Sequence, residues 1–305
     1  ENHITATDNA QVELYHNGVQ KFETTATGAK VTGALEVTQE YPTIRPTLDL
    51  NFAATKSLDR RITFTRDSLG TYTDELGIIR YASNNVPRFD HDPTTGESLG
   101  LLIEESRTNL ITYSSNLSTN VVNTGVNITS ESSVVAPDGD TGKVFKAAPT
   151  TGNSVHHYRY DDDNSSSGTF TASVWAKNAG GGSVRLHISG GSNYGGSNPN
   201  VYVDLTDGSV ISYNASNSTY SVTSYKDGWY RISLTATSSG TQSSFLYIMP
   251  NSDFGTFAGN GTDGVYVWGA QIEVGAFATS YIPTSGSTVT RAADIAKIIG
   301  TNFTD

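Results

Sequence analysis

The sequence predicts an all-β protein with three parts: a short intertwined β shaft, a small β-rich collar domain and a jelly-roll β-sandwich. The 305-residue chain holds 30 Gly, 16 Tyr and 11 Phe, and charged residues make up only 16% of it. Short runs of alternating apolar and polar residues are separated by clusters of Gly, Asn, Ser and Asp. No long stretch has the hydrophobic period of a helix, so we expect strands throughout. The expected boundaries are 1–40 for the shaft, 41–108 for the collar, 109–295 for the jelly roll and 296–305 for a segment leading towards a further domain.

The shaft segment contains a predicted hairpin over Val12–Glu23, with Asn17-Gly18 as a type I′ turn because both residues accept a positive φ. Alternation predicts two faces, one with Val12, Leu14 and Val19 and the other with Tyr15 and Phe22. A lone hairpin is marginal in water, and the Thr-, Gly- and Ala-rich residues that follow are too small to give it a core. We therefore expect copies of the chain to wrap around one another; a disordered Thr-rich leader is the alternative.

The collar is dense in charge, and its carboxylates invite an active-site interpretation. Glu104 and Glu105 are adjacent on a predicted strand, so they point to opposite faces and cannot form the facing pair of a glycosidase. Asp90 and Asp92 share one side of their strand and could form a pair, or bind a cation beside Glu97. We favour a network of arginine–carboxylate pairs that fixes strand order and joins chains.

The jelly roll is predicted from short alternating strands with turn-rich connections. The strand candidates are residues 154–160, 169–178, 183–189, 200–205, 228–237, 244–250 and 264–274. The region is long enough to enclose its own core. We expect Trp229 in that core, Arg231 tied to a loop, and Glu273 hydrogen-bonded to the backbone or to an arginine.

Several segments of the sequence resemble segments found in one class of proteins. Residues 15–37 (YHNGVQKFETTATGAKVTGALEV) resemble the repeating β motif of bacteriophage tail-fibre shafts, which assemble as trimers. Residues 45–110 contain RPTLDLNFA, RITFTR, NVPRFDHDP and GLLIEESRTNL, and are similar to a module of phage and prophage tail proteins. FTASVWAKN, DGWYRISLTAT and VYVWGAQIEVGAFATSYIPTSGSTVTRAAD, within 109–295, resemble the carbohydrate-binding-module-like jelly roll of phage tail fibres and related viral adhesins.

This resemblance implies a receptor-binding tail-fibre protein of the virion. The implied partners are two sister copies in a homotrimer, other tail proteins, and the polysaccharide or lipopolysaccharide of the host cell surface. We expect no enzymatic activity. Two alternatives stay open: an architectural fibre segment without its own ligand, and a polysaccharide-degrading tailspike, although the sequence shows neither long parallel-helix repeats nor an obvious paired carboxylate.

A sugar site in a jelly roll needs aromatic rings for the apolar sugar faces and polar groups for the hydroxyls. Alternation places Phe170, Val174 and Leu186 inside, and the residues of the opposite stripes become candidates for the binding face. Strand 154–160 is ambiguous, because either its tyrosines or its His157 and Arg159 could face outward. The candidate carbohydrate-binding residues are Trp175, Lys177, Arg185, His187, Tyr158, Tyr160 and Tyr202, with Tyr194 as a separate candidate on a loop tip. A solvated or interchain face is the alternative.

Metal and nucleic-acid sites have weaker support. Asp161 and Asp163 offer oxygen ligands for a structural calcium ion, but the loop lacks the spacing of a dedicated calcium loop, so a solvated turn is the alternative. We expect no other cofactor; the chain has no cysteine, and adjacent His156 and His157 diverge, which disfavours zinc. The net charge of −11, without a basic run, disfavours a nucleic-acid partner. No apolar run approaches ~18 residues, so we expect no membrane insertion.

Overall fold

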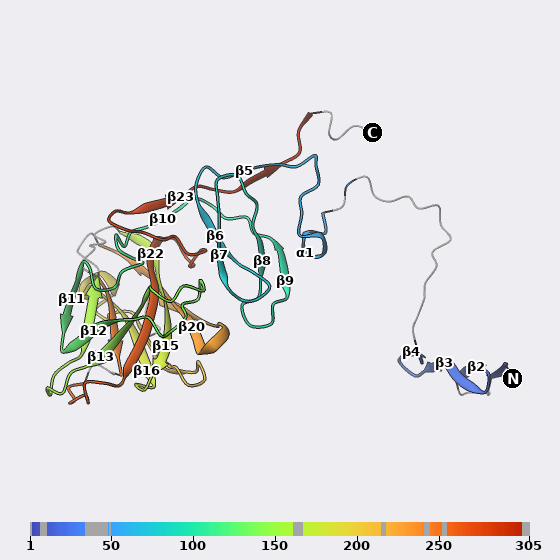
Figure 1. Cartoon of the computed structure of the whole chain (residues 1–305), viewed down its shortest axis with the longest axis horizontal. Coiled ribbons are helices and arrows are strands. Elements are labelled where there is room, and N and C mark those ends of the chain that lie inside the picture. Colours follow the sequence, from blue (N-terminus) through green and yellow to red (C-terminus); the bar gives the residue numbers. More distant parts are fainter. Residues whose placement is uncertain are drawn as a thin grey trace. The chain divides into compact units, whose positions relative to one another are not determined.

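The computed structural model describes residues 2–6, 11–33, 48, 50–160, 167–214, 218–240, 245–251 and 255–300. Within these residues the chain is all-β, as the sequence predicts, and is built from antiparallel sheets (Figure 1). It divides into two compact units, Glu1–Asp49 and Leu50–Asp305. The described part of the chain contains no helix with the length and hydrophobicity that crossing a bilayer requires.

The first unit is a four-stranded sheet in the order β1-β2-β3-β4. Its strands are β1 (His3–Ala6), β2 (Val12–His16), β3 (Val19–Thr25) and β4 (Gly28–Val31). The predicted turn is confirmed, because Asn17 and Gly18 have φ angles of 50° and 77°, as a type I′ turn requires. The hairpin is therefore the middle of a larger sheet.

One face of this sheet is apolar. The register shifts between Leu14 and Tyr15, so that Leu14 lies opposite Phe22, and the prediction that these two side chains lie on opposite faces is wrong. The cause is one extra residue in β3, since a one-residue shift moves a side chain to the other face. The corrected register aligns Ile4, Leu14, Phe22 and Val31 in one row across all four strands.

The other face of the first sheet is polar. Glu13, Glu23 and Lys30 are cross-strand neighbours there, and Lys30 Nζ lies 2.7 Å from Glu23 Oε1. The Tyr15 ring stacks on His3 with 4.3 Å between centroids, and its hydroxyl donates to Glu13 Oε2 at 2.9 Å. The small sheet is therefore amphipathic, with one face suited to water and one that is not.

The second unit begins with the collar, which consists of short hairpins. Its elements are α1 (Phe52–Thr55), β5 (Thr63–Thr65), β6 (Gly70–Thr73), β7 (Ile79–Ala82), β8 (Phe89–His91) and β9 (Ser98–Leu101). Strand β6 pairs with β7, and β8 pairs with β9. Strand β5 pairs with β24 (Ile295–Lys297), so residues from both ends of the second unit close the collar.

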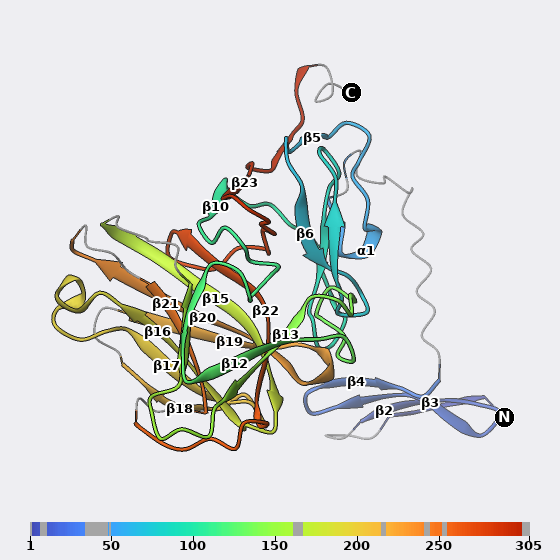
Figure 2. The same cartoon turned by 60° about the vertical axis from the view of Figure 1, so that its left-hand side comes forward.

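The sandwich consists of two six-stranded antiparallel sheets (Figure 2). The first has the order β11-β14-β21-β16-β17-β18 and the second β12-β13-β22-β15-β20-β19. A short pair joins β10 (Arg107–Asn109) to β23 (Val289–Arg291). The remaining elements are β11 (Val121–Thr124), β12 (Val126–Glu131), β13 (Val144–Pro149), β14 (His157–Tyr160), β15 (Gly168–Ala179), β16 (Ser183–Ser189), η1 (Gly191–Tyr194), β17 (Asn200–Asp204), β18 (Val210–Tyr213), β19 (Ser218–Ser224), η2 (Lys226–Gly228), β20 (Trp229–Ser238), β21 (Phe245–Pro250) and β22 (Gly264–Val274).

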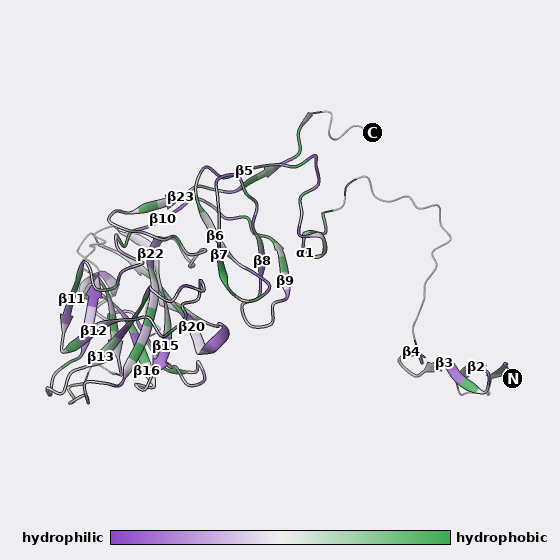
Figure 3. Ribbon diagram, in the orientation of Figure 1, coloured by the Kyte–Doolittle hydropathy of each residue, from purple (hydrophilic) through white to green (hydrophobic). Residues whose placement is uncertain are grey.

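The main core lies between these two sheets, where the predicted inner stripes meet. Phe170 and Val174 of β15 and Leu186 of β16 are all buried in it, as expected. Hydrophobic and hydrophilic residues alternate along the sandwich strands, as Figure 3 shows. Because successive side chains of a strand point to opposite faces, each sheet also has an outer face. These two outer faces are where a binding site could lie.

Candidate functional site

The outer face of the second sheet is not open to solvent around Trp175. Trp175, Trp229 and Trp268 form a second buried cluster there, together with Ile79 of the collar and Tyr281. The ring centroid of Trp175 lies 5.1 Å from that of Trp268 and 5.7 Å from that of Tyr281. Trp175 is only 1% exposed, so the prediction that it stacks on a sugar is wrong. Alternation identified its face correctly, but the collar covers that face.

Three predicted site tyrosines lie in the main core instead. Tyr158 and Tyr160 of β14 point between the sheets, which leaves His157 and Arg159 on the outer face. Tyr194 does not occupy a solvent-exposed loop tip, because η1 directs its ring to within 6.1 Å of the Phe170 ring centroid. All three are corrections: a buried ring is not available to a saccharide.

The outer face of the first sheet gathers three other predicted residues. Arg185 of β16 lies beside Tyr202 of β17, with the guanidinium carbon 5.0 Å from the ring centroid. His187 lies next to Tyr247, which the sequence did not single out, at 5.6 Å between ring centroids. Arg185 and His187 are only 9% and 4% exposed, so this face offers a ligand little open surface. Lys177 lies apart from them, half-buried on β15 of the second sheet.

His187 has a distinctive electrostatic environment on this face. Burial disfavours the charged imidazolium, and the nearby Arg185 and His157 add repulsion, which lowers the pKa of His187 to about 4. Its imidazole is therefore neutral near pH 7. A neutral histidine between aromatic and cationic neighbours packs without requiring a counter-ion.

The proposed calcium ligands Asp161 and Asp163 lie outside the described residues. Among the residues that are described, no group of three or more His, Cys, Asp or Glu side chains could hold a metal ion. Asp92, another acidic candidate, instead accepts the backbone N–H groups of Thr94 and Thr95 at 2.9 and 2.7 Å, as a turn-forming aspartate does.

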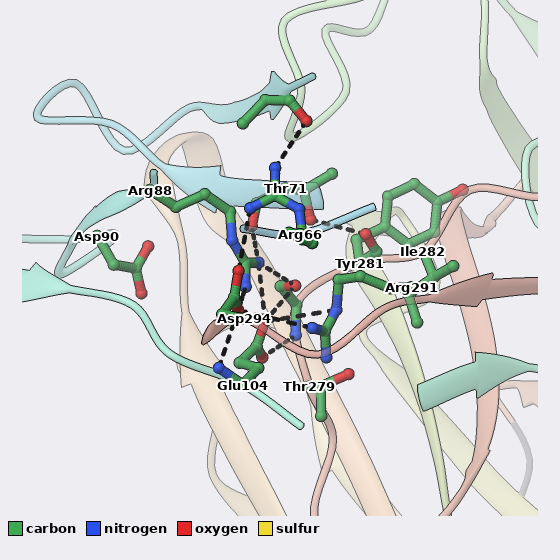
Figure 4. Close-up of polar contacts among 12 residues, drawn as sticks. Arg66, Thr71, Arg88, Asp90, Glu104, Thr279, Tyr281, Ile282, Arg291 and Asp294 are labelled. Carbon is green, nitrogen blue, oxygen red and sulfur yellow. Dashed lines mark hydrogen bonds and ion pairs between the residues drawn. The ribbon is translucent and has the colours of Figure 1, made fainter. Parts of the chain in front are cut away.

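A buried ionic cluster joins the collar to the C-terminal part of the second unit. Figure 4 shows Arg66, Arg88 and Arg291 converging on Asp294. Arg66 donates to Asp294 Oδ1 at 3.0 Å, and Arg88 donates to Asp294 Oδ2. Arg88 also lies 2.8 Å from Glu104 Oε2. The expected arginine–carboxylate network is therefore present within one chain.

The carboxylate of Glu104 is engaged by several ion pairs and hydrogen bonds of this cluster. Its carboxylate accepts from the Ser280 N–H at 2.8 Å and from the Ser280 hydroxyl at 2.7 Å, in addition to its arginine contacts. Burial disfavours its charge, but Arg291, Arg88 and the Ser280 hydrogen bonds outweigh burial and lower the pKa of Glu104 below its usual range. Such a carboxylate is a structural anion rather than a nucleophile or a proton acceptor.

Other structural expectations for this region are confirmed. The buried Trp229 donates its indole N–H to the Val135 carbonyl at 3.0 Å. Arg231 donates to the Thr279 carbonyl at 2.7 Å and so ties down the segment after β22. Glu273 accepts the Thr279 N–H at 3.0 Å and also its hydroxyl.

A pocket of about 240 Å³ opens beside the ionic cluster, which we call the seam pocket because collar and sandwich residues both line it. Its chemically active lining comprises Asp90, Glu104, Tyr225 and Arg231. Asp90 is half-buried and accepts the Thr73 N–H at 2.7 Å. Burial raises the pKa of the Asp90 carboxyl above its usual range, and the Thr73 hydrogen bond only partly offsets this.

Arg231 forms one wall of the seam pocket. Its guanidinium carbon lies 4.3 Å from the centroid of the Trp175 ring, and the same group donates to Ser173 Oγ at 3.2 Å. These contacts hold the guanidinium in a fixed orientation. The buried Arg231 Nε has no hydrogen-bond partner among the described residues.

A second hollow, of about 250 Å³, adjoins the seam pocket and shares Arg231 and Ala278 with it. We call it the hydroxyl hollow, because cross-strand pairs Thr219–Thr235 and Ser221–Ser233 of β19 and β20 line it. Phe277, which is 56% exposed, also lines it. The alternation of Arg231, Ser233 and Thr235 in β20 can be read directly from the sequence. Exposed Ser and Thr residues are too common in proteins, however, to identify a binding site.

No protein-family model matches this chain, and no curated protein sequence matches it either. The chemistry of the two adjoining hollows is therefore the main guide to function. Together their linings supply hydroxyls, a guanidinium, two carboxylates and an exposed aromatic ring.

Proposed function

We propose that this chain is part of a bacteriophage tail fibre that adheres to glycans on the host cell surface, as a homotrimer in the virion. The observation that carries the proposal is the pair of hollows joined at Arg231. Saccharides are bound by aromatic rings against their apolar faces and by polar side chains at their hydroxyls. Phe277 supplies the ring, and the Ser and Thr hydroxyls of β19 and β20 supply the hydrogen bonds.

The first unit supports the assembly part of the proposal. Its apolar row of Ile4, Leu14, Phe22 and Val31 has no second layer within the described part of the first unit, and Ile4 is 72% exposed. Exposed apolar surface of this kind is buried when sister copies pack against it. Three linked copies would raise the effective concentration of weak sugar sites, so a shallow site is sufficient for firm adhesion. Other tail proteins would hold the fibre in the particle.

A polysaccharide-cleaving activity is the alternative that the two carboxylates of the seam pocket raise. Hydrolysis of a glycosidic bond needs one carboxyl group to donate a proton and another to act as base or nucleophile. Burial raises the pKa of the Asp90 carboxyl, which is the direction that a proton donor requires. Glu104, however, is held by Arg88 and Ser280 and is not free to attack. Binding therefore has better support than cleavage.

A polysaccharide array tests the proposal. The intact chain is applied to immobilised capsular polysaccharides and lipopolysaccharides from a broad set of bacteria, and we expect selective retention by some of them. Ser221→Trp, which fills the hydroxyl hollow from an exposed position, should abolish retention. Ser130→Trp, at an exposed position of β12 in the same sheet, is the matched control and should leave it unchanged. Retention by no polysaccharide would refute the adhesion proposal, and new reducing ends would favour cleavage.

A further inference from the structure

The geometry points to a terminal, uncharged sugar ring as the occupant of the seam pocket, with the next unit of the glycan in the hydroxyl hollow. This inference rests on the proposed function and adds the class of ligand and its orientation. The two hollows share Arg231 and Ala278 in their linings, so they are neighbours, and successive units of one glycan can occupy them.

The size of the seam pocket limits its occupant. Sites for drug-sized molecules typically have about 300–1,000 Å³, so a pocket of about 240 Å³ suits something smaller, such as one sugar ring. Buried residues, among them Thr71, Thr279 and Tyr281, line the pocket and leave little room for a continuing chain. A polymer can therefore place its end there, but not its middle.

The hydrogen-bonding groups of the seam pocket match a hydroxyl. Asp90 accepts the Thr73 N–H at 2.7 Å, and a carboxylate has capacity for several bonds. Arg231 uses one terminal nitrogen for Thr279 and Ser173, and its guanidinium also lines the pocket. A ligand hydroxyl can donate to the Asp90 carboxylate and accept from the Arg231 guanidinium, which neither a pure donor nor a pure acceptor can do.

The charges at the seam pocket favour an uncharged ring. Glu104 is paired with Arg88 at 2.8 Å and with Arg291 at 3.5 Å inside the ionic cluster, so Asp90 is the carboxylate of the lining that has no arginine ion pair among the described residues. An acidic sugar would bring a second carboxylate close to Asp90 in a partly buried space. Like charges held close together under such conditions repel strongly.

Competition with small glycosides tests the inference. A polysaccharide retained on the array is immobilised, and methyl glycosides of glucose, galactose, mannose and N-acetylglucosamine are compared with methyl glucuronide as soluble competitors. We expect at least one uncharged glycoside to compete and the glucuronide to fail. Asp90→Asn should lower the affinity for that glycoside about tenfold or more. Asp67→Asn, at an exposed collar position, is the matched control and should have no effect.

A second variant separates the two hollows. Ser221→Trp should prevent the polysaccharide from binding while the uncharged glycoside still binds in solution, as measured by saturation-transfer NMR. Better competition by glucuronide, or an Asp90→Asn variant that folds and binds normally, would overturn this inference and leave the adhesion proposal intact. Failure of every polysaccharide to bind would defeat both.

Discussion

Replacing Asp294 by asparagine should strongly destabilise the second unit. The Asp294 carboxylate accepts from Arg66 at 3.0 Å, from Arg88, and from the Glu104 N–H at 2.9 Å. Its side chain is fully buried, as are those of Arg66 and Arg88. Asn has the same shape, but it is neutral and carries an N–H2 group where one of the oxygens stood. The change therefore leaves buried guanidinium groups without their shared counter-ion.

The magnitude follows from the cost of an uncompensated buried charge. Removing one partner of a buried ion pair typically costs about 3–5 kcal/mol. For a domain of roughly this size, 1 kcal/mol shifts Tm by about 2–4 °C, so the expected loss is about 6–20 °C. Acid should weaken the same cluster. Since the pKa of Glu104 is lowered by folding, its contribution is complete above its unfolded pKa and is lost as the pH falls through its folded pKa.

Differential scanning calorimetry of the intact chain at neutral pH measures this loss. Asp67→Asn removes the same charge from an exposed collar residue and should shift Tm by no more than about 2 °C. If Asp294→Asn melts within about 2 °C of that control, the ionic cluster does not hold the collar to the sandwich as we infer.

Two further predictions concern pH and assembly. Because the pKa of His187 is about 4 in the folded chain and about 6.5 when unfolded, stability should fall by up to about 3 kcal/mol between pH 6.5 and 4, and His187→Gln should flatten that part of the profile in urea titrations. A profile of unchanged slope would show that His187 does not titrate as described. Leu14→Asp places a charge in the apolar row of the first sheet and should convert the proposed trimer to monomer in analytical ultracentrifugation, whereas Thr25→Asp at an exposed strand end should not. A trimer that survives Leu14→Asp would mean that this face does not hold the copies together.

The inner stripes of the sandwich could be predicted because strand side chains alternate strictly. Phe170, Val174 and Leu186 are buried between the sheets as expected. The same rule placed Trp175 on the outer face but could not reveal that the collar and Tyr281 cover it. Alternation tells which side of a sheet a residue faces, and only tertiary packing decides whether that side meets water.

Other features depended on contacts that are remote in sequence. Arg66 and Asp294 are separated by 228 positions, so no local spacing could pair them, although a network of this kind was expected from the density of charge. The extra residue in β3 moved Phe22 to the face of Leu14, and nothing in the hairpin sequence marks that bulge. The hydroxyl hollow also needs Ala276, Phe277 and Ala278, which are remote in sequence from β19 and β20.

Hydrogen–deuterium exchange tests most directly whether the two joined hollows are the place where the chain meets a glycan. The intact chain is compared with and without a saturating amount of a polysaccharide that it retains. We expect slower exchange confined to residues 71–73, 219–223 and 276–281, which line the hollows. Slower exchange at 157–159 and 185–187 instead, with these segments unchanged, would place the contact on the opposite sheet and contradict the account.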